Sequence, residues 1–289
     1  LTCLKNILPL YHYNYEYQTW YYYGYIPGQN QMFALFPYMV LTSGYACILT
    51  ADLKKGYFTK EPEMLKMLSE IFENCHSHAS RFASLADSAN HAAEQMAFLS
   101  ATFSERSTGY SLQMEPCFMP VLTKETLQKY VRKDLPGREI FLVQLQDYTR
   151  QLAKQKMIYI CSMEGILSFL QNGRIPEIPD GLYEIPSASD RIQIVKALLA
   201  PERATRLRIL KNSIGNTETP VYLYITPKTG TLRLPLATDQ MVNLQIQETG
   251  MLEAFYDFCE NLDEEMFYSF EEAEQIVEEE MKAGDWKTE

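Results

Sequence analysis

The sequence predicts an α/β (or α+β) fold built of two similar α/β lobes that a helical layer joins. Two observations favour this class: one strand–strand–helix unit occurs twice along the chain, and 46% of the 289 residues are apolar. Two strands joined by a turn cannot bury their faces alone, so each unit needs a helix to cover its sheet. A chain of this length and composition can bury a sizeable core.

The repeated unit spans residues 36–74 and 221–261. Each copy reads as two turn-linked strands, a short return segment and a helix. The helical parts, 64–74 and 251–261, align without a gap, begin with Met-Leu and end with Glu-Asn. A true internal repeat is therefore predicted, and a chance match between two amphipathic helices is the alternative.

We divide the chain into three predicted domains. Residues 1–105 form the first α/β lobe with an aromatic strand, 106–155 form a mainly helical connector, and 156–289 form the second α/β lobe with an acidic C-terminal helix. In the first two domains the apolar spacing predicts a second helix after Asp87, a strand over 109–119 and helices over 61–85, 124–133 and 139–154.

The second lobe begins with a fully apolar strand. Ser162 follows that strand and is expected to cap the next helix, which Asn172 and Gly173 close. Ser269 and Glu272 have the spacing of a capping box at the start of the last helix. The predicted elements before the second repeat copy are strands over 157–161 and 206–210 and helices over 163–171 and 189–199.

The net charge of −11 comes almost entirely from the end of the chain. Residues 260–289 hold twelve acidic residues against two lysines, so the rest of the chain is close to neutral. A nearly neutral body lacks the basic excess expected of a surface that binds nucleic acid by itself. We interpret the acidic end as the solvated face of a helix, with a docking tail as the alternative.

Cysteine usage and hydropathy bear on the compartment. The six cysteines are scattered singly, without the spacing of a zinc site or the density of a disulfide scaffold. No apolar run approaches the roughly 20 residues that a membrane helix needs, so no membrane partner is expected. A reducing cytoplasm is predicted. Residue 1 is leucine, which leads us to expect a missing upstream segment.

A run of tyrosines near the N-terminus is the main candidate site. Four of them alternate with polar residues, which is the period of a half-buried strand. One interpretation is core packing. The other is a ligand-binding ladder, because each buried hydroxyl needs a partner that a wet cavity or an interface supplies. The residues of this candidate ligand site are Tyr11, Tyr13, Tyr15, Tyr17, Trp20 and Tyr22.

The first 85 or so residues resemble a known family. The segments that carry the resemblance are 18–24, 35–42 and 56–58, the last leading into a helix. They are similar to the C-terminal region of bacterial Xre-type (lambda-repressor-like) helix-turn-helix transcription regulators. The resemblance implies a region that senses a signal or holds a dimer. No DNA-binding helix-turn-helix precedes Tyr11, so DNA would be reached only through an upstream domain absent from this chain.

Catalytic and metal-binding patterns are weak. His76 and His78 are two apart on a predicted helix and point to opposite sides, so they cannot share a metal. Ser162 lies where a strand meets a helix but lacks the glycines of a nucleophile elbow. We therefore predict no catalytic residues, no metal and no cofactor. Arg206 and Arg208 share one strand face and are a candidate anion clamp, with a solvated outer face as the alternative.

These observations lead to one functional expectation. The chain is predicted to be a non-enzymatic effector domain of a transcription regulator that senses an unknown small molecule or peptide and forms a homodimer. An uncharacterised enzyme and a protein-interaction module are the alternatives. An enzyme needs convergent groups with perturbed pKa values in one pocket, whereas an interaction module needs a large exposed apolar patch.

Overall fold

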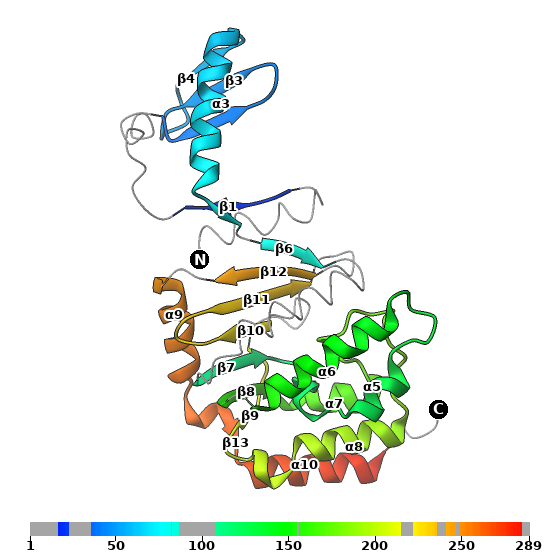
Figure 1. Ribbon diagram of the computed structural model, residues 1–289. Coiled ribbons are helices and arrows are strands. Elements are labelled where there is room, and N and C mark those ends of the chain that lie inside the picture. Colours follow the sequence, from blue (N-terminus) through cyan, green and yellow to red (C-terminus); the bar gives the residue numbers. More distant parts are fainter. Residues whose placement is uncertain are drawn as a thin grey trace. The chain divides into compact units, whose positions relative to one another are not determined.

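We describe the protein from a computed structural model (Figure 1), which defines residues 17–22, 36–81, 83–86, 108–154, 156–214, 222–235, 241–246 and 249–284. The chain forms two compact units. The smaller unit spans 16–83, and the larger unit comprises 1–15 and 84–289. Among the helices of the described residues, none is long and apolar enough to cross a bilayer.

The smaller unit contains an antiparallel sheet of three strands in the order β2, β3, β4, with bounds Tyr38–Leu41, Ala46–Leu49 and Gly56–Thr59. Helix α3 (Pro62–Ser77) follows and lies across one face of this sheet (Figure 1). Proline stands in the first turn of α3, where no helical hydrogen bond is lost. A separate ladder pairs β1 (Trp20–Tyr21) with β5 (Ser80–Arg81).

The larger unit is built on an eight-stranded mixed sheet. Strands β7, β8 and β9 run parallel, so their carboxyl ends meet at one edge, where α/β proteins commonly bind ligands. The other pairings with a resolved register are antiparallel. In spatial order the strands are β13 (Phe267–Tyr268), β9 (Leu207–Leu210), β8 (Lys156–Ser162), β7 (Thr108–Gln113), β10 (Tyr222–Ile225), β11 (Gly230–Pro235), β12 (Met241–Ile246) and β6 (Ala83–Ala86).

Helices cover both faces of this sheet. On one face, Tyr256 of α9 packs edge-on against Tyr110 of β7. On the other face, α5, α6, α7, α8 and α10 share one buried core with the strands. The helical bounds are η1 (Met119–Val121), α5 (Lys124–Tyr130), α6 (Arg138–Lys154), α7 (Met163–Asn172), α8 (Ala188–Leu198), η2 (Pro201–Arg203), α9 (Thr249–Glu260), η3 (Glu264–Met266) and α10 (Phe270–Ala283).

Several predicted helix ends are confirmed by their caps. The Thr123 hydroxyl accepts a hydrogen bond from Thr126 N, and α5 begins there. Gly173 closes α7 in the left-handed conformation, at φ 68°. The capping box between Ser269 and Glu272 is present in both directions. These caps satisfy backbone groups that a helix end would otherwise leave unpaired. Because the capping residues are close in sequence to the helix ends, the sequence predicts those ends correctly.

The start of α7 lies directly against the end of β7. Ser162 Oγ accepts a hydrogen bond from Gly165 N and donates one to Met114 O at 3.0 Å. A Cβ built on Gly165 would come 2.1 Å from Met114 O. The close approach therefore requires glycine at this position.

Three predicted boundaries were wrong. Helix α3 ends at Ser77 and not near Leu85, because the side chains of Ser77 and His78 bond back to Asn74 O and the chain then joins β5. No glycine or proline marks this end. The strand expected over 109–119 stops at Gln113, and the helix expected to reach residue 133 stops at Tyr130, since Val131 pairs with Tyr183 in an isolated bridge.

The α/β class is confirmed in its broad form. Both segments of the predicted repeat contain an antiparallel three-strand meander followed by a helix: β2, β3, β4 and α3 in one, and β10, β11, β12 and α9 in the other. Their settings differ, since the first meander is a sheet of its own and the second is part of the eight-stranded sheet. The internal repeat, the two similar lobes and the domain bounds at 105 and 155 stay predictions. The compact units divide the chain around 16–83.

Candidate functional site

The predicted aromatic site falls only partly on described residues. Tyr11, Tyr13 and Tyr15 lie outside them, as does the helix expected after Asp87. Trp20 packs edge-on against His76 of α3, with ring centroids 4.4 Å apart. Tyr22 meets His78 in the same manner at 6.5 Å, and Tyr17 lies just before β1. Trp20 and Tyr22 therefore contact the end of α3, and the ligand ladder stays a prediction.

The two predicted anion-clamp residues lie at strand β9. Arg208 pairs with Glu264 at 2.7 Å, and its guanidinium lies 3.8 Å from the ring centroid of Phe267. Arg206 precedes β9, and its carbonyl accepts a hydrogen bond from Tyr159 N. An anion at Arg208 would have to compete with Glu264. The clamp stays a prediction, and the observed contacts of Arg208 are with Glu264 of η3 and Phe267 of β13.

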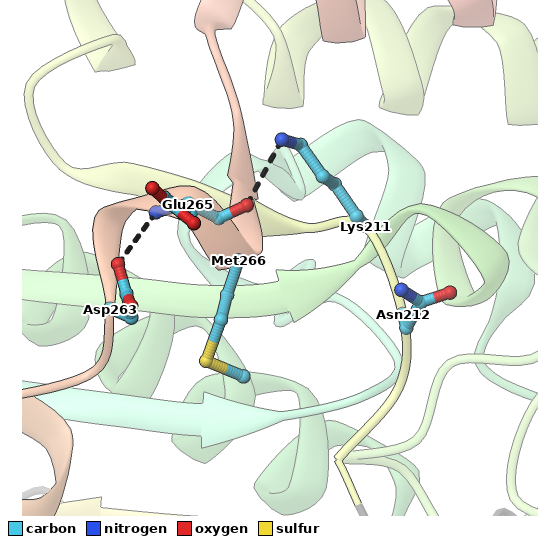
Figure 2. Close-up of a pocket in the computed structure, with 5 residues that line it drawn as sticks. All are labelled: Lys211, Asn212, Asp263, Glu265 and Met266. Atoms are coloured by element: carbon cyan, nitrogen blue, oxygen red, sulfur yellow. Dashed lines mark hydrogen bonds between the residues drawn. The ribbon is translucent and has the colours of Figure 1, made fainter.

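A pocket lies next to the Arg208–Glu264 ion pair, at the carboxyl end of β9. Figure 2 shows Lys211 Nζ donating to Glu265 O at 3.0 Å, and Glu265 N donating to Asp263 Oδ1 at 2.9 Å. The pocket has a volume of about 280 Å³. Its lining residues bring one cation, two carboxylates, an amide and a thioether, and Lys211 Nζ and Asp263 Oδ1 are engaged in the two bonds just given. The lining residues are Lys211, Asn212, Asp263, Glu265 and Met266.

A buried polar cluster lies deeper in the larger unit, and we call it the Glu177 cluster. Strand register places two rows of its side chains on one face of the sheet. Tyr222 of β10 is the cross-strand neighbour of Gln113 on β7 and of Arg233 on β11. Tyr224 is likewise the neighbour of Ser111 and Thr231, and cross-strand neighbours point to the same face. Its members, all buried, are Ser111, Gln113, Cys117, Tyr148, Glu177, Tyr224, Thr231 and Arg233.

Hydrogen bonds connect the centre of the Glu177 cluster. Gln113 Nε2 donates to Glu177 Oε1 at 2.9 Å, and the Tyr224 hydroxyl donates to Gln113 Oε1 at 3.2 Å. Five buried polar atoms of the cluster have no hydrogen-bond partner, although native proteins leave few such groups unpaired. These atoms are Ser111 Oγ, Tyr148 Oη, Glu177 Oε2, Thr231 Oγ1 and Arg233 Nε.

Burial dominates the electrostatics of this cluster. It raises the pKa of Glu177 from its ordinary value, while the hydrogen bond from Gln113 and the charge of Arg233 lower it. Burial and the nearby Glu177 carboxyl also raise the pKa of the Cys117 thiol well above its ordinary value. A thiol that stays protonated is a poor nucleophile, so Cys117 is not activated in this arrangement.

The serine at the strand–helix junction is occupied by structural bonds. Ser162 Oγ caps α7, as the sequence predicted, and also accepts from Ser213 Oγ at 3.1 Å. Ser213 Oγ lies 2.9 Å from Glu164 Oε2. The described residues also contain no group of three or more histidine, cysteine or acidic side chains that would hold a metal ion.

The smaller unit presents an apolar surface that we call the open sheet face. It is the side of β2–β3–β4 opposite α3, because alternate strand residues point to opposite faces. The register aligns Val40 with Cys47 and Phe58 across the three strands. The open sheet face consists of Tyr38, Val40, Tyr45, Cys47, Leu49 and Phe58, of which Tyr38, Val40, Tyr45 and Phe58 are 49%, 52%, 42% and 56% exposed.

Comparisons with protein families, curated proteins and solved structures found no match for this chain. The function proposed below therefore depends on the geometry of the described residues and on the sequence. Sequence reasoning missed the Glu177 cluster because its members come from strands, a helix and loops far apart in the chain. The one signal was the alternation of Ser111 and Gln113 with apolar residues in a strand that helices cover on both faces.

Proposed function

We propose that this chain is the non-catalytic effector part of a transcription regulator and that it forms a homodimer through the open sheet face. The regulator class rests on the resemblance of the first 85 or so residues. The dimer rests on one observation: a contiguous apolar sheet surface exposed to solvent. In this proposal DNA contact is assigned to a separate domain, as the resemblance implies.

The open sheet face has the properties of an interface. Contiguous exposed apolar patches on soluble proteins usually mark interaction sites. The rings of Tyr45 and Phe58 lie 5.6 Å apart, so the aromatic surface is continuous across the strands. By contrast, few side chains are buried on the α3 side, where Ala46, Thr59 and Leu68 are the buried examples in this sheet and helix. A small unit with so few buried side chains gains most from covering its second face.

Charge favours a second copy as the partner. Residues 36–51 contain no charged side chain, whereas the whole chain carries −11. The part of the face formed by β2 and β3 therefore brings no like charges into contact when two copies meet, whereas Lys60 Nζ lies 5.9 Å from the Phe58 ring centroid on β4. The same patch serves both partners in a twofold dimer. Residues 36–81 are balanced, with five basic and five acidic residues: Lys54, Lys55, Lys60, Lys66, Arg81 and Asp52, Glu61, Glu63, Glu70, Glu73.

The size of the face sets the expected affinity. Three strands about 4.8 Å apart and four residues long, at about 3.4 Å per residue, give a footprint of roughly 200 Å². A standard interface buries about 800 Å² of accessible surface per partner, so this face alone supports a weak dimer. We expect dissociation in the micromolar range.

The sensed molecule in this proposal is a small molecule or peptide. The pocket beside Lys211 supports that part, since it lies at the edge where the parallel strands end. Its mix of one lysine and two carboxylates suits a ligand that carries both hydrogen-bond donors and acceptors.

The dimer is tested by sedimentation at tens of micromolar. We expect Val40→Lys and Phe58→Lys to shift the wild-type dimer to monomer, because each places a charge in an apolar contact. Val143→Lys on α6 is the matched control: Val143 is 65% exposed but lies in the larger unit. Circular dichroism checks that each variant folds. A monomeric wild type, or equal dissociation by Val143→Lys, would contradict the proposal.

An enzyme remains the second candidate, and one observation favours it. Glu177 is a buried carboxyl whose pKa is raised, and it belongs to the same cluster as the Cys117 thiol. Groups with perturbed pKa values often mark active sites. The protonated thiol argues against nucleophilic catalysis, because the thiolate is the reactive form.

A further inference from the structure

The segment 173–181, which carries Glu177, has the construction of a hinged flap. Gly173 and Gly181 begin and end it, both in the left-handed conformation at φ 68° and φ 86°. Glycine adopts this conformation without strain and is a common hinge residue. Pro176 and Pro179 lie between them and restrict the backbone on either side of Glu177. The segment is therefore stiff in the middle. Gly173 is held in place as the C-cap of α7, and Gly181 has open space around it, so Gly181 is the end at which the segment can turn.

The contacts of the flap are of two kinds. On its outside, Arg174 reaches Glu115 at 3.2 Å and Asp180 at 3.6 Å, both partly exposed pairs that contribute little stability. On its inside, Ile175 and Ile178 are each 2% exposed. Its polar contact with the sheet is the hydrogen bond from Gln113 Nε2 of β7 to Glu177 Oε1, and Ile175 N also donates to the buried Tyr183 hydroxyl at 2.7 Å. Glu177 thus provides the polar attachment between the flap and the sheet.

The surroundings of Glu177 suit a neutral carboxyl better than a carboxylate. An ionised carboxylate has about four acceptor positions to satisfy. Glu177 is 1% exposed and receives the amide of Gln113 on one oxygen, and the Cys117 thiol is the second side chain that bonds to the carboxyl. A buried charge with so few hydrogen bonds is costly, whereas the protonated group needs fewer donors.

The titratable and charged groups around this carboxyl add one hydrogen bond to it, from the Cys117 thiol, which is a weak donor. They are Cys117 before η1, Tyr148 of α6, Tyr222 and Tyr224 of β10, and Arg233 of β11. Arg233 is the cation among them. Its charge lowers the pKa of Glu177, but within the described residues the two side chains form no ion pair. The burial effect, which raises that pKa, is the larger one.

We propose that segment 173–181 is a proton-operated latch, which Glu177 holds against β7 when its carboxyl is protonated and releases as the carboxyl ionises. The released state frees Gln113 and uncovers the Glu177 cluster. This device is separate from the dimer contact, which lies in the smaller unit.

The direction of the pH effect follows from the sign of the shift. The folded-state pKa of Glu177 is raised above the ordinary value of 4.5. A group with a raised folded pKa contributes stability that is complete below the unfolded pKa and is lost as the pH rises through the folded pKa. The latch is therefore tight at acidic pH and loosens progressively above about pH 4.5.

Hydrogen exchange of the full chain, followed by mass spectrometry, tests the latch. The quantity to compare is the exchange rate of peptides covering 173–181 in wild type and Glu177→Gln at the same pH, which cancels the intrinsic pH dependence of exchange. The glutamine variant keeps the acceptor for Gln113 and cannot ionise. We expect the ratio of wild-type to variant rate to be near one at or below about pH 4.5 and to rise several-fold as the pH increases through the raised pKa of Glu177.

Two further variants keep the test decisive. Asp180→Asn changes a carboxyl to an amide in the same segment but on its exposed side, so its rate ratio to wild type should not vary with pH. Gln113→Glu places a second carboxyl beside Glu177, which disfavours ionisation and should move the loosening to higher pH. A wild-type to Glu177→Gln ratio that does not change with pH, or an Asp180→Asn effect of the same size, would overturn the latch.

Discussion

The two meanders of this protein have the same order of elements and opposite surfaces. In β2–β3–β4 the side away from α3 is apolar and exposed. In β10–β11–β12 the side away from α9 carries Tyr222, Tyr224, Thr231 and Arg233, and helices of the same unit cover it. The two meanders therefore differ in the face that points away from their own helix. One sheet lacks a cover in its own unit, and the other has a cover over a polar interior.

The largest expected difference comes from removing one tyrosine from each meander. Tyr224→Ala empties a fully buried position in the larger unit and should cost about 3–5 kcal/mol in the free energy of unfolding. Tyr45→Ala removes an exposed ring and should change it by no more than about 0.5 kcal/mol. Urea melts followed by circular dichroism measure both. At a protein concentration below the dimer's dissociation constant, equal losses would show that the open sheet face is covered within the monomer.

A smaller effect is expected at the helix starts. Ser269→Ala breaks the capping box of α10 and should destabilise the larger unit by about 1 kcal/mol. Helix α3 has Glu61 at its N-cap without a side-chain hydrogen bond, so Glu61→Ser should stabilise the smaller unit by about 0.5–1 kcal/mol. Hydrogen exchange of each helix reports the two units separately. If Glu61→Ser made the amides of α3 exchange faster, the interpretation of Glu61 as a weak N-cap would be contradicted.

The smallest effect on stability is expected from alkylation at neutral pH. Cys47, on the open sheet face, is partly exposed and should react with iodoacetamide while the protein stays folded. Cys117 is buried, with a pKa raised well above its ordinary value, and should react only after unfolding. Peptide mapping by mass spectrometry gives both rates. Rapid labelling of Cys117 in the folded protein would favour the enzyme alternative.

Local chemistry explains what the sequence predicted correctly. Helices α7 and α10 were located because Ser162, Gly173 and Ser269 act within one turn of the helix end. The same logic failed at the end of α3, where Ser77 and His78 cap the helix without a glycine or proline to mark it. The candidate site was harder still, since Glu177 meets Gln113 across 64 positions of sequence. No local pattern encodes that contact or the order of the eight strands.

Gly165 restricts how this fold can vary. The carbonyl of Met114 occupies the space that any larger side chain at position 165 would need. Such a side chain would separate the start of α7 from the end of β7 and break the two bonds that Ser162 makes there. In evolutionary terms, glycine here and serine three positions earlier should be inherited together, and the pair gives a signature with which to look for distant relatives that keep this junction.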